Sequence, residues 1–340
     1  MAAHGPDGQE GPTSIGLTDE QTALNAELDS LATERVLDDE LMLDALSTSE
    51  LVAMMNDRDS GIAASVRQAA PVISAAIQEA STRMLAGGRL IYVGAGTSGR
   101  LGVLDASEVP PTFGTSRDVV VGLIAGGPSA LVSSIESAED SEESGAADLA
   151  QLSPGPLDTV VGIASSGRTP YVMGALRHAS AHGALTVGLV CNTEAPISNM
   201  VDFGIELDVG PEIVTGSTRL GAGTATKMVL NMFSTITMIG LGKTYKTLMV
   251  DVKASNAKLV HRAVRIVMLA TGADKTVART ALEAADWNAK LAIACIATGL
   301  TVDAARRALD ASNGVLRKVI RDAATPAPQE RTPARCAYSE

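Results

Sequence analysis

Between residues 89 and 250, short apolar runs rich in Val and Ile alternate with helical stretches. The runs are Leu90–Val93, Val119–Ile124, Thr159–Ala164, Leu185–Val190 and Ile205–Val209. The predicted helices between them are Gly99–Ser107, Ser129–Ser137 and Tyr171–His182. Strands that alternate with helices form βαβ units, which build a parallel sheet through right-handed crossovers. The sequence therefore predicts an α/β fold with a parallel sheet flanked by helices.

The regions on either side of this segment show helical patterns without strands. Residues 17–88 are predicted to form a helical lead-in, and residues 251–322 a small C-terminal helical domain. Residues 1–16 and 323–340 are polar and rich in Pro or Gly, and we expect them to be disordered extensions. Residues 89–250 are left as the central α/β domain.

Composition narrows the class of protein. Hydrophobic residues make up 46% of the 340 residues but aromatic ones only 2%, so the core must use Ala, Val, Ile, Leu and Met. The net charge of −12 argues against nucleic acid or an anionic membrane as partner. Three scattered cysteines, no apolar run of membrane length and no signal peptide predict a cytoplasmic protein in a reducing compartment.

A glycine-rich loop, Gly94-Ala95-Gly96-Thr97-Ser98-Gly99-Arg100, follows the first predicted strand. Its glycines let the backbone approach a ligand, Thr97 and Ser98 carry hydroxyls, and the next helix presents free N–H groups. The loop is not a Walker A motif, and the acidic residue that a dinucleotide-binding fold requires after the second strand is missing. Taken alone, it is also consistent with a plain strand-to-helix turn.

A second hydroxyl-rich loop, Ser165-Ser166-Gly167-Arg168-Thr169-Pro170, follows the third predicted strand. Thr169 lies where a helix N-cap is expected, and Pro170 lies at the first helical position. A polar turn with a cap is thus one interpretation, but it gives no reason for Ser165 and Ser166.

A third stretch of this kind, residues 212–227, begins a long apolar helix that runs to about Ile239. Ser217 or Thr218 is a candidate cap for that helix. Arg219 and Lys227 place positive charge near a helix start, where the macrodipole gains nothing from it. This placement favours an anionic ligand or a partner carboxylate.

Ligands of open parallel sheets bind beyond the carboxyl ends of the strands, which is where these loops lie. Phosphate oxygens accept hydrogen bonds well from hydroxyls and backbone N–H groups. No His/Asp/Glu cluster suggests a metal, and we predict neither a metal nor a cofactor. The predicted phosphate ligands are Thr97, Ser98, Ser165, Ser166, Gly167, Thr169, Ser217 and Arg219.

Two glutamates are candidates for proton transfer. Glu108 precedes Val109-Pro110-Pro111, and we expect the two prolines to end the helix there. A carboxylate at a helix C-terminus opposes the dipole, which favours the protonated form that a general acid needs. Glu139 lies in an acidic run, and spacing alone does not select it from its neighbours. An exposed helix end and a solvated acidic face are the respective alternatives.

The strings GAGTSGR and SSGRTP resemble the sugar isomerase (SIS) domain, a flavodoxin-like sheet that recognises sugar phosphates. From about Leu31 to Val319 the chain closely resembles the N-acetylmuramic acid 6-phosphate etherases. The strings that carry this resemblance are GAGTSGRLGVLDASEVPPTF, VGLIAGG, VGIASSGRTPY, VTGSTRLGAGTATK and MVDVKASNAKL. One departure is Val36-Leu37, where the family has polar residues in a segment close to its active site.

The resemblance implies an elimination of lactate from a phosphorylated amino sugar, followed by addition of water. The products would be N-acetylglucosamine 6-phosphate and D-lactate. It implies that Glu108 protonates the departing lactate and then activates water, and that Glu139 is the base at C2. It also implies a homodimer.

Three other functions stay open. An aldose–ketose isomerase on the same fold would need a base but would not expel lactate, and the DASE string at residues 105–108 speaks against it. A non-catalytic sugar-phosphate sensor resembling the glucokinase regulatory protein would bind without turnover. An oxidoreductase would require the missing acidic ribose ligand.

Overall fold

A computed structural model describes residues 31–135, 137–251 and 257–324. The predicted N-terminal extension, residues 1–16, lies outside the described residues. So does the predicted C-terminal tail from residue 325 onward, whereas residues 323 and 324 are the end of the last helix.

The centre of the molecule is a parallel sheet with the strand order β2-β1-β3-β4-β5. The strands are β1 (Leu90–Gly94), β2 (Val120–Ile124), β3 (Thr159–Ile163), β4 (Leu185–Val190) and β5 (Phe203–Glu206). This is the flavodoxin-like order, so the predicted fold class is confirmed. The last strand begins two residues before its predicted start at Ile205 and ends at Glu206 rather than Val209.

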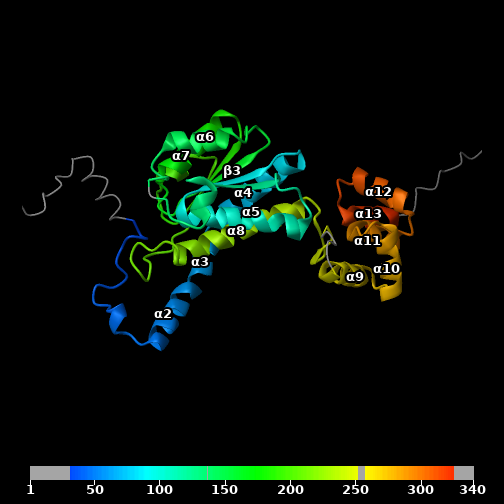
Figure 1. The fold of residues 1–340 in the computed structure, drawn as a ribbon, viewed down its shortest axis with the longest axis horizontal. Coiled ribbons are helices and arrows are strands. Elements are labelled where there is room, and N and C mark those ends of the chain that lie inside the picture. Colours follow the sequence, from blue (N-terminus) through cyan, green and yellow to red (C-terminus); the bar gives the residue numbers. More distant parts are fainter. Residues whose placement is uncertain (1–30, 136, 252–256, 325–340) are drawn as a thin grey trace, which may run out of the picture.

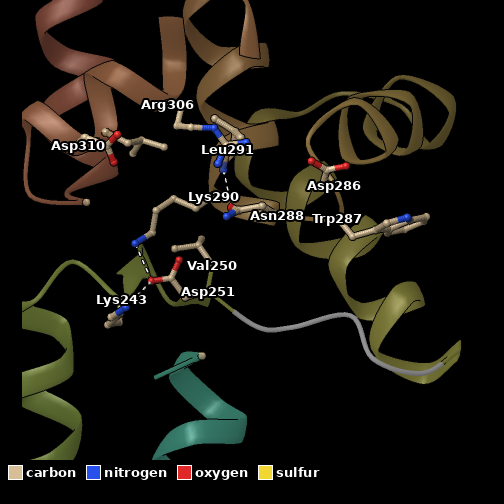
Figure 2. Close-up of a pocket in the computed structure, with 13 residues that line it drawn as sticks. Lys243, Val250, Asp251, Asp286, Trp287, Asn288, Lys290, Leu291, Arg306 and Asp310 are labelled. Carbon is tan, nitrogen blue, oxygen red and sulfur yellow. Dashed lines mark hydrogen bonds and ion pairs between the residues drawn. The ribbon is translucent and has the colours of Figure 1, made fainter. Parts of the chain in front are cut away.

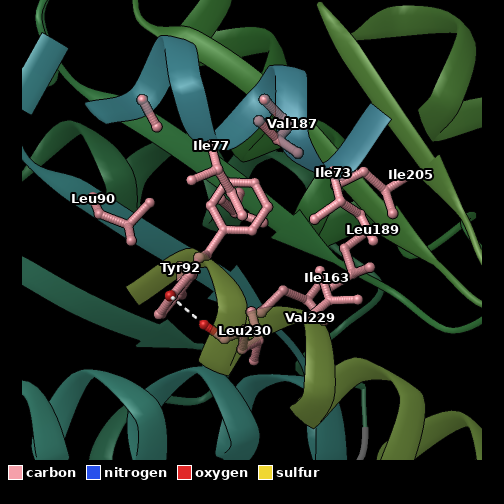
Figure 3. Packing of buried hydrophobic residues seen from close by; sticks show 14 of the residues in the cluster. Ile73, Ile77, Leu90, Tyr92, Ile163, Val187, Leu189, Ile205, Val229 and Leu230 are labelled. Carbon is pink, nitrogen blue, oxygen red and sulfur yellow. Dashed lines mark hydrogen bonds between the residues drawn. The ribbon is translucent and has the colours of Figure 1, made fainter. Parts of the chain in front are cut away.

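Successive side chains of β1 point to opposite faces of the sheet, and each face is covered by helices (Figure 1). Leu90 and Tyr92 pack with α4 and α8 on one face, as Figure 3 shows. Ile91 and Val93 pack on the other face with residues of α7. The flanking helices are α4 (Ala70–Leu85), α5 (Gly96–Phe113), α6 (Glu142–Ala150), α7 (Pro170–Ala181) and α8 (Gly221–Gly240).

Residues 17–30 of the predicted lead-in lie outside the described residues, and the part that follows is less helical than predicted. Residues 31–47 contain turns and one short 3-10 helix, η1 (Leu43–Ala45). Regular helix begins with α2 (Thr48–Ser60), where Ser47 and Glu50 form a capping box, and continues with α3 (Ile62–Gln68). Ile62 is buried in the sheet core, which fixes α3 against the central domain.

The helix predicted over Ser129–Ser137 is wrong. A 3-10 helix, η2 (Gly127–Leu131), follows β2, and the next α-helix begins only at Glu142. Gly126 and Gly127 both have positive φ, and Ser137 has φ 63°, so the backbone leaves the helical region at both ends of this segment. Serines also compete with helix formation by bonding to nearby backbone groups, as the Ser129 hydroxyl does to the Gly126 carbonyl.

The predicted helix stop at Pro110-Pro111 is also wrong, because α5 continues through both prolines to Phe113. A proline inside a helix costs about 3 kcal/mol. Val109 and Phe113 flank the prolines and are both buried in the core, and burying such side chains contributes about 1.5–3 kcal/mol each. Packing therefore offsets the lost hydrogen bonds. Gly114, with φ 65°, ends the helix.

The C-terminal region forms a helical domain with its own apolar core, as predicted. Its helices are α9 (Ala257–Thr271), α10 (Lys275–Ala284), α11 (Ala289–Thr298), α12 (Val302–Ala311) and α13 (Leu316–Ala324). A short hairpin of β6 (Thr244–Tyr245) and β7 (Leu248–Met249) precedes it, and η3 (Pro196–Met200) connects β4 to β5. Among the described residues, no helix is long and apolar enough to cross a membrane.

Candidate functional site

The loop after β1 brings a helix N-terminus to the carboxyl edge of the sheet. A Cβ on Gly94 would lie 2.7 Å from the Gly99 nitrogen, so this glycine is needed for close packing. Gly96 has φ 51° and open space around it, which leaves the backbone accessible. Thr97 is half-buried and Ser98 is buried. Among the described residues no side chain caps α5, so its first N–H groups can meet an anion.

The loop after β3 is a tight turn that exposes hydroxyls next to the start of α7. Gly167 has φ 69° and donates its N–H to the Ala164 carbonyl at 3.0 Å. The Ser166 hydroxyl accepts the Arg168 N–H at 3.3 Å. Thr169 occupies the N-cap position, but its side chain makes no cap hydrogen bond. The first turn of α7 offers few free N–H groups, because Pro170 has none and the Tyr171 N–H donates to the Glu139 carbonyl.

The start of α8 is capped by a residue that the sequence analysis missed. The carboxylate of Glu212, which is buried, accepts the N–H groups of Gly221 and Ala222 at 2.9 Å each. Neither Ser217 nor Thr218 caps the helix, because the N-cap position is Leu220. The sequence feature that could have identified Glu212 as a cap is its position shortly before a helix start, where a carboxylate interacts favourably with the helix dipole.

Thr33 and Asn192 join the second and third loops. The Asn192 amide donates to the Thr33 hydroxyl at 3.1 Å and to the Ser165 carbonyl at 2.9 Å. The Thr33 carbonyl in turn accepts the Gly216 N–H at 3.3 Å. Asn192 follows β4. Residues that follow the carboxyl ends of parallel strands are candidates for ligand binding, and the same rule therefore applies to Asn192.

Arg219 lies in the turn before α8. It lines a small cavity of about 140 Å³ with Arg58 and Asp59 of α2 and with Glu212. Ser217 is half-buried in the turn before α8, where its N–H bonds to the Val214 carbonyl. The structure thus groups the predicted hydroxyls at the sheet edge but does not place Arg219 in a cavity with them.

Glu139 shares a cavity of about 280 Å³ with the first loop. Gly96 and Arg100 line the same cavity, and Glu139 is exposed there. Its carbonyl accepts the Tyr171 N–H at 3.0 Å, which ties this segment to α7. The Arg100 guanidinium donates to the carbonyls of Leu131 and Ser133 and holds the preceding loop against α5.

Glu108 lies elsewhere in the same chain. It is exposed on α5, twelve residues after Gly96, which is about 18 Å along a helix. It lines two cavities between α5 and α8, of about 470 and 200 Å³, and neither contains Glu139. One chain therefore brings Glu139 to the first loop but does not bring the two glutamates together.

A buried carboxyl group lies one helical turn before Glu108. Asp105 accepts hydrogen bonds from the Tyr92 hydroxyl at 2.9 Å, the Asn231 amide at 2.7 Å and the Ser234 hydroxyl at 3.1 Å. Burial raises the pKa of Asp105 above its usual value, although the hydrogen bonds from its three donors act in the opposite direction. These bonds connect β1, α5 and α8, so they fix the helix that carries Glu108.

A cavity of about 630 Å³ contains none of the predicted site residues. It lies among the C-terminal helices, the end of α5 and Asp251, where the ammonium groups of Lys243 and Lys290 converge on Asp251 (Figure 2). Burial lowers the pKa of Lys290, and the nearby Asp251 carboxylate opposes that effect. Among the described residues, no group of three or more His, Cys, Asp or Glu could hold a metal ion.

Comparison with known proteins defines the class first: residues 72–180 match the family described as glucokinase regulatory protein N-terminal SIS domain. Together with the strand order, this makes the central unit a SIS-type domain. An N-acetylmuramic acid 6-phosphate etherase from Streptomyces avermitilis is 55% identical over 88% of this chain and 97% of its own. One from Mycolicibacterium smegmatis is 51% identical over 82% of this chain and 93% of its own. The chain belongs to the N-acetylmuramic acid 6-phosphate etherase family.

Among solved structures, a phosphoheptose isomerase from Francisella tularensis aligns with a TM-score of 0.44 and 13% identity, over 57% of this chain and all of that one.

Proposed function

We propose that this protein cleaves the D-lactyl ether of N-acetylmuramic acid 6-phosphate. The products are N-acetylglucosamine 6-phosphate and D-lactate, which makes the enzyme a carbon–oxygen lyase. The observation that carries the proposal is the gathering of hydroxyl-bearing loops and the uncapped start of α5 at one sheet edge, in a chain that is 55% identical to a named etherase.

The 6-phosphate is bound at this edge. Thr97, Ser98, Ser165, Ser166 and Thr169 supply hydroxyls, and the first turn of α5 supplies N–H groups. Oriented N–H groups at helix starts favour an anion without a metal. The turns at Gly96 and Gly167 let the backbone approach the phosphate closely.

The reaction consists of an elimination and a hydration. In the open-chain sugar the C1 aldehyde acidifies the C2 proton, which Glu139 removes. The C3–O bond then breaks, Glu108 gives its proton to the ether oxygen, and lactate leaves. Water, deprotonated by Glu108, adds its hydroxyl to C3 while C2 regains a proton. Each proton-transfer assistance contributes about 100- to 10,000-fold in rate.

Two copies of the chain complete the site. A sugar 6-phosphate is much shorter than the roughly 18 Å that separates Gly96 from Glu108 along α5. The proposed homodimer resolves this distance if Glu108 of one copy faces the phosphate-binding loops of the other. Exposed apolar side chains on α5 and α8, namely Leu104, Ile236 and Ile239, suit burial against a second copy.

The direct test is incubation of the protein with N-acetylmuramic acid 6-phosphate and enzymatic measurement of D-lactate. We expect stoichiometric lactate and N-acetylglucosamine 6-phosphate. A protein that binds the substrate but releases no lactate over hours would overturn the proposal. Incubation in H₂¹⁸O adds a mechanistic readout, because hydration at C3 places the label in the sugar.

A second candidate function is non-catalytic sensing of sugar phosphates. The match of residues 72–180 to a regulatory protein's SIS domain favours this alternative. Tight binding of a sugar 6-phosphate without any turnover would support it. Conversion of an aldose phosphate to a ketose phosphate would instead support an isomerase.

A further inference from the structure

A small cavity between α5 and α8 places a cation next to Glu108. The cavity has a volume of about 200 Å³, and its polar lining comes from Asp105, Glu108, Lys227 and Asn231. Leu101, Leu104 and Leu230 provide its apolar lining. It thus combines carboxyl groups, a positive charge and an apolar wall.

The ammonium of Lys227 is available to a ligand. Lys227 is exposed, and within residues 31–135, 137–251 and 257–324 no carboxylate oxygen lies within 4.0 Å of it. Asp105 lines the same cavity, and the positive charge of Lys227 acts to lower its pKa. The Asp105 carboxylate, however, already accepts hydrogen bonds from Tyr92, Asn231 and Ser234. Lys227 therefore has the charge, and the cavity the space, to receive an external anion.

The leaving group of the proposed reaction has the matching chemistry. In a lactyl ether, the carbon attached to the ether oxygen also carries a carboxylate and a methyl group. If Glu108 protonates the ether oxygen, the carboxylate must lie within a few bond lengths of Glu108. Negative charge that develops on the ether oxygen is repelled by this carboxylate, and a cation beside it reduces the repulsion.

We propose that Lys227 binds the carboxylate of the lactyl group, with the leucine side chains of the same cavity facing the lactyl methyl. The inference rests on the proposed function and adds a residue that distinguishes a lactyl ether from a sugar phosphate without one. Phosphate recognition at the sheet edge does not involve Lys227.

A natural control is Lys246, the other ammonium near Glu108. It lines the neighbouring cavity of about 470 Å³ and lies 5.5 Å from the centre of the Tyr245 ring. This cation–π contact holds it at the β6–β7 turn. Lys246→Met removes a similar charge from the same region without touching the proposed carboxylate site.

The test compares N-acetylmuramic acid 6-phosphate with its lactamide analogue, in which a neutral amide replaces the carboxylate. We expect wild type and Lys246→Met to prefer the acid. Lys227→Met should lose about 10- to 100-fold in kcat/KM for the acid, as expected for one hydrogen bond to a charged group, and should no longer distinguish acid from amide. Lys227→Arg should keep part of the preference.

Inhibition by N-acetylglucosamine 6-phosphate, which lacks the lactyl group, should be the same in wild type and Lys227→Met. Full discrimination between acid and amide by Lys227→Met, or its loss in Lys246→Met instead, would overturn the assignment. Absence of lactate release from wild type would overturn the proposed function and this inference together, so the two failures are distinguishable.

Discussion

Thr33 and Asn192, 159 positions apart in the chain, are joined by two hydrogen bonds: the Thr33 N–H donates to the Asn192 side-chain oxygen at 3.3 Å, and the Asn192 amide donates to the Thr33 hydroxyl at 3.1 Å. Both residues are buried. This pair fixes the lead-in segment against the loops that we propose bind the phosphate.

Asn192→Ala removes these bonds and leaves buried polar groups unpaired. We expect a loss of about 1–3 kcal/mol in the free energy of unfolding and a higher KM, because the loop at Ser165 loses its support. Urea denaturation and steady-state kinetics measure the two effects. Asn199→Ala, at an exposed position on η3, should change stability by less than about 0.5 kcal/mol. Equal effects of the two variants would contradict the role of the pair.

Glu108→Gln keeps the shape of the side chain but replaces the carboxyl group, which can donate a proton, by an amide that cannot act as an acid. Lactate release should fall about 100- to 10,000-fold in kcat, while the affinity for N-acetylglucosamine 6-phosphate stays unchanged. Calorimetry measures the affinity, and a lactate assay measures the rate. Glu283→Gln, in the C-terminal domain, serves as control. Near-normal turnover by Glu108→Gln would remove Glu108 from the mechanism.

Ser166→Ala removes one hydroxyl from the loop after β3. Because the phosphate is remote from the bond that breaks, we expect KM to rise more than kcat falls. A rise of about 10- to 100-fold in KM corresponds to the loss of one hydrogen bond to a charged group, at about 1.5–3 kcal/mol. An unchanged KM would show that the phosphate binds elsewhere.

A shared site between two copies predicts complementation. Ser166→Glu places a negative charge in the phosphate-binding loop, and Glu108→Gln removes the acid, so each variant alone should be inactive. Co-expressed as random homodimers, they should recover about a quarter of wild-type activity, because half of the dimers contain one intact site. Activity no greater than the sum of the separate variants would mean that both residues act within one chain.

The surroundings of Asp158 predict that the free energy of unfolding depends on pH. Burial alone would raise its pKa, but hydrogen bonds from Arg89 and Gly155 outweigh burial, and the pKa is lowered. A lowered pKa in the folded state gives stability that is present above the unfolded pKa of about 3.9 and is lost as the pH falls through the folded value. Asp158→Asn should therefore destabilise by about 1–3 kcal/mol at neutral pH, and by less in acid.

Urea denaturation at several pH values measures this difference. Asp118→Asn is the matched control, since Asp118 is exposed and interacts with Arg89 only at a distance. A difference between Asp158→Asn and wild type that stays constant from neutral pH to below the carboxyl range would contradict the prediction.

Strand positions and hydroxyl loops were predictable because their signals are local. Short apolar runs such as Leu185–Val190 indicate buried strands. Glycines at turns indicate positive φ, as at Gly167. Helix boundaries were less predictable where packing competes with propensity. At Pro110 the conformational preference of proline predicts the end of the helix, but the helix continues because Val109 and Phe113 are buried in the core.

By itself, the sequence determined the parallel sheet, the loops at its carboxyl edge and the resemblance to the etherases, because these depend on residues close together in the chain. Tertiary structure alone decided that Glu212 rather than Ser217 caps α8 and that Asn192 connects two loops. It also decided that Glu108 faces α8 beside Lys227 while Glu139 faces the first loop. The reason is physical. The direction in which a side chain points from a helix depends on which face of the helix is buried, and only contacts between segments distant in the sequence determine that face.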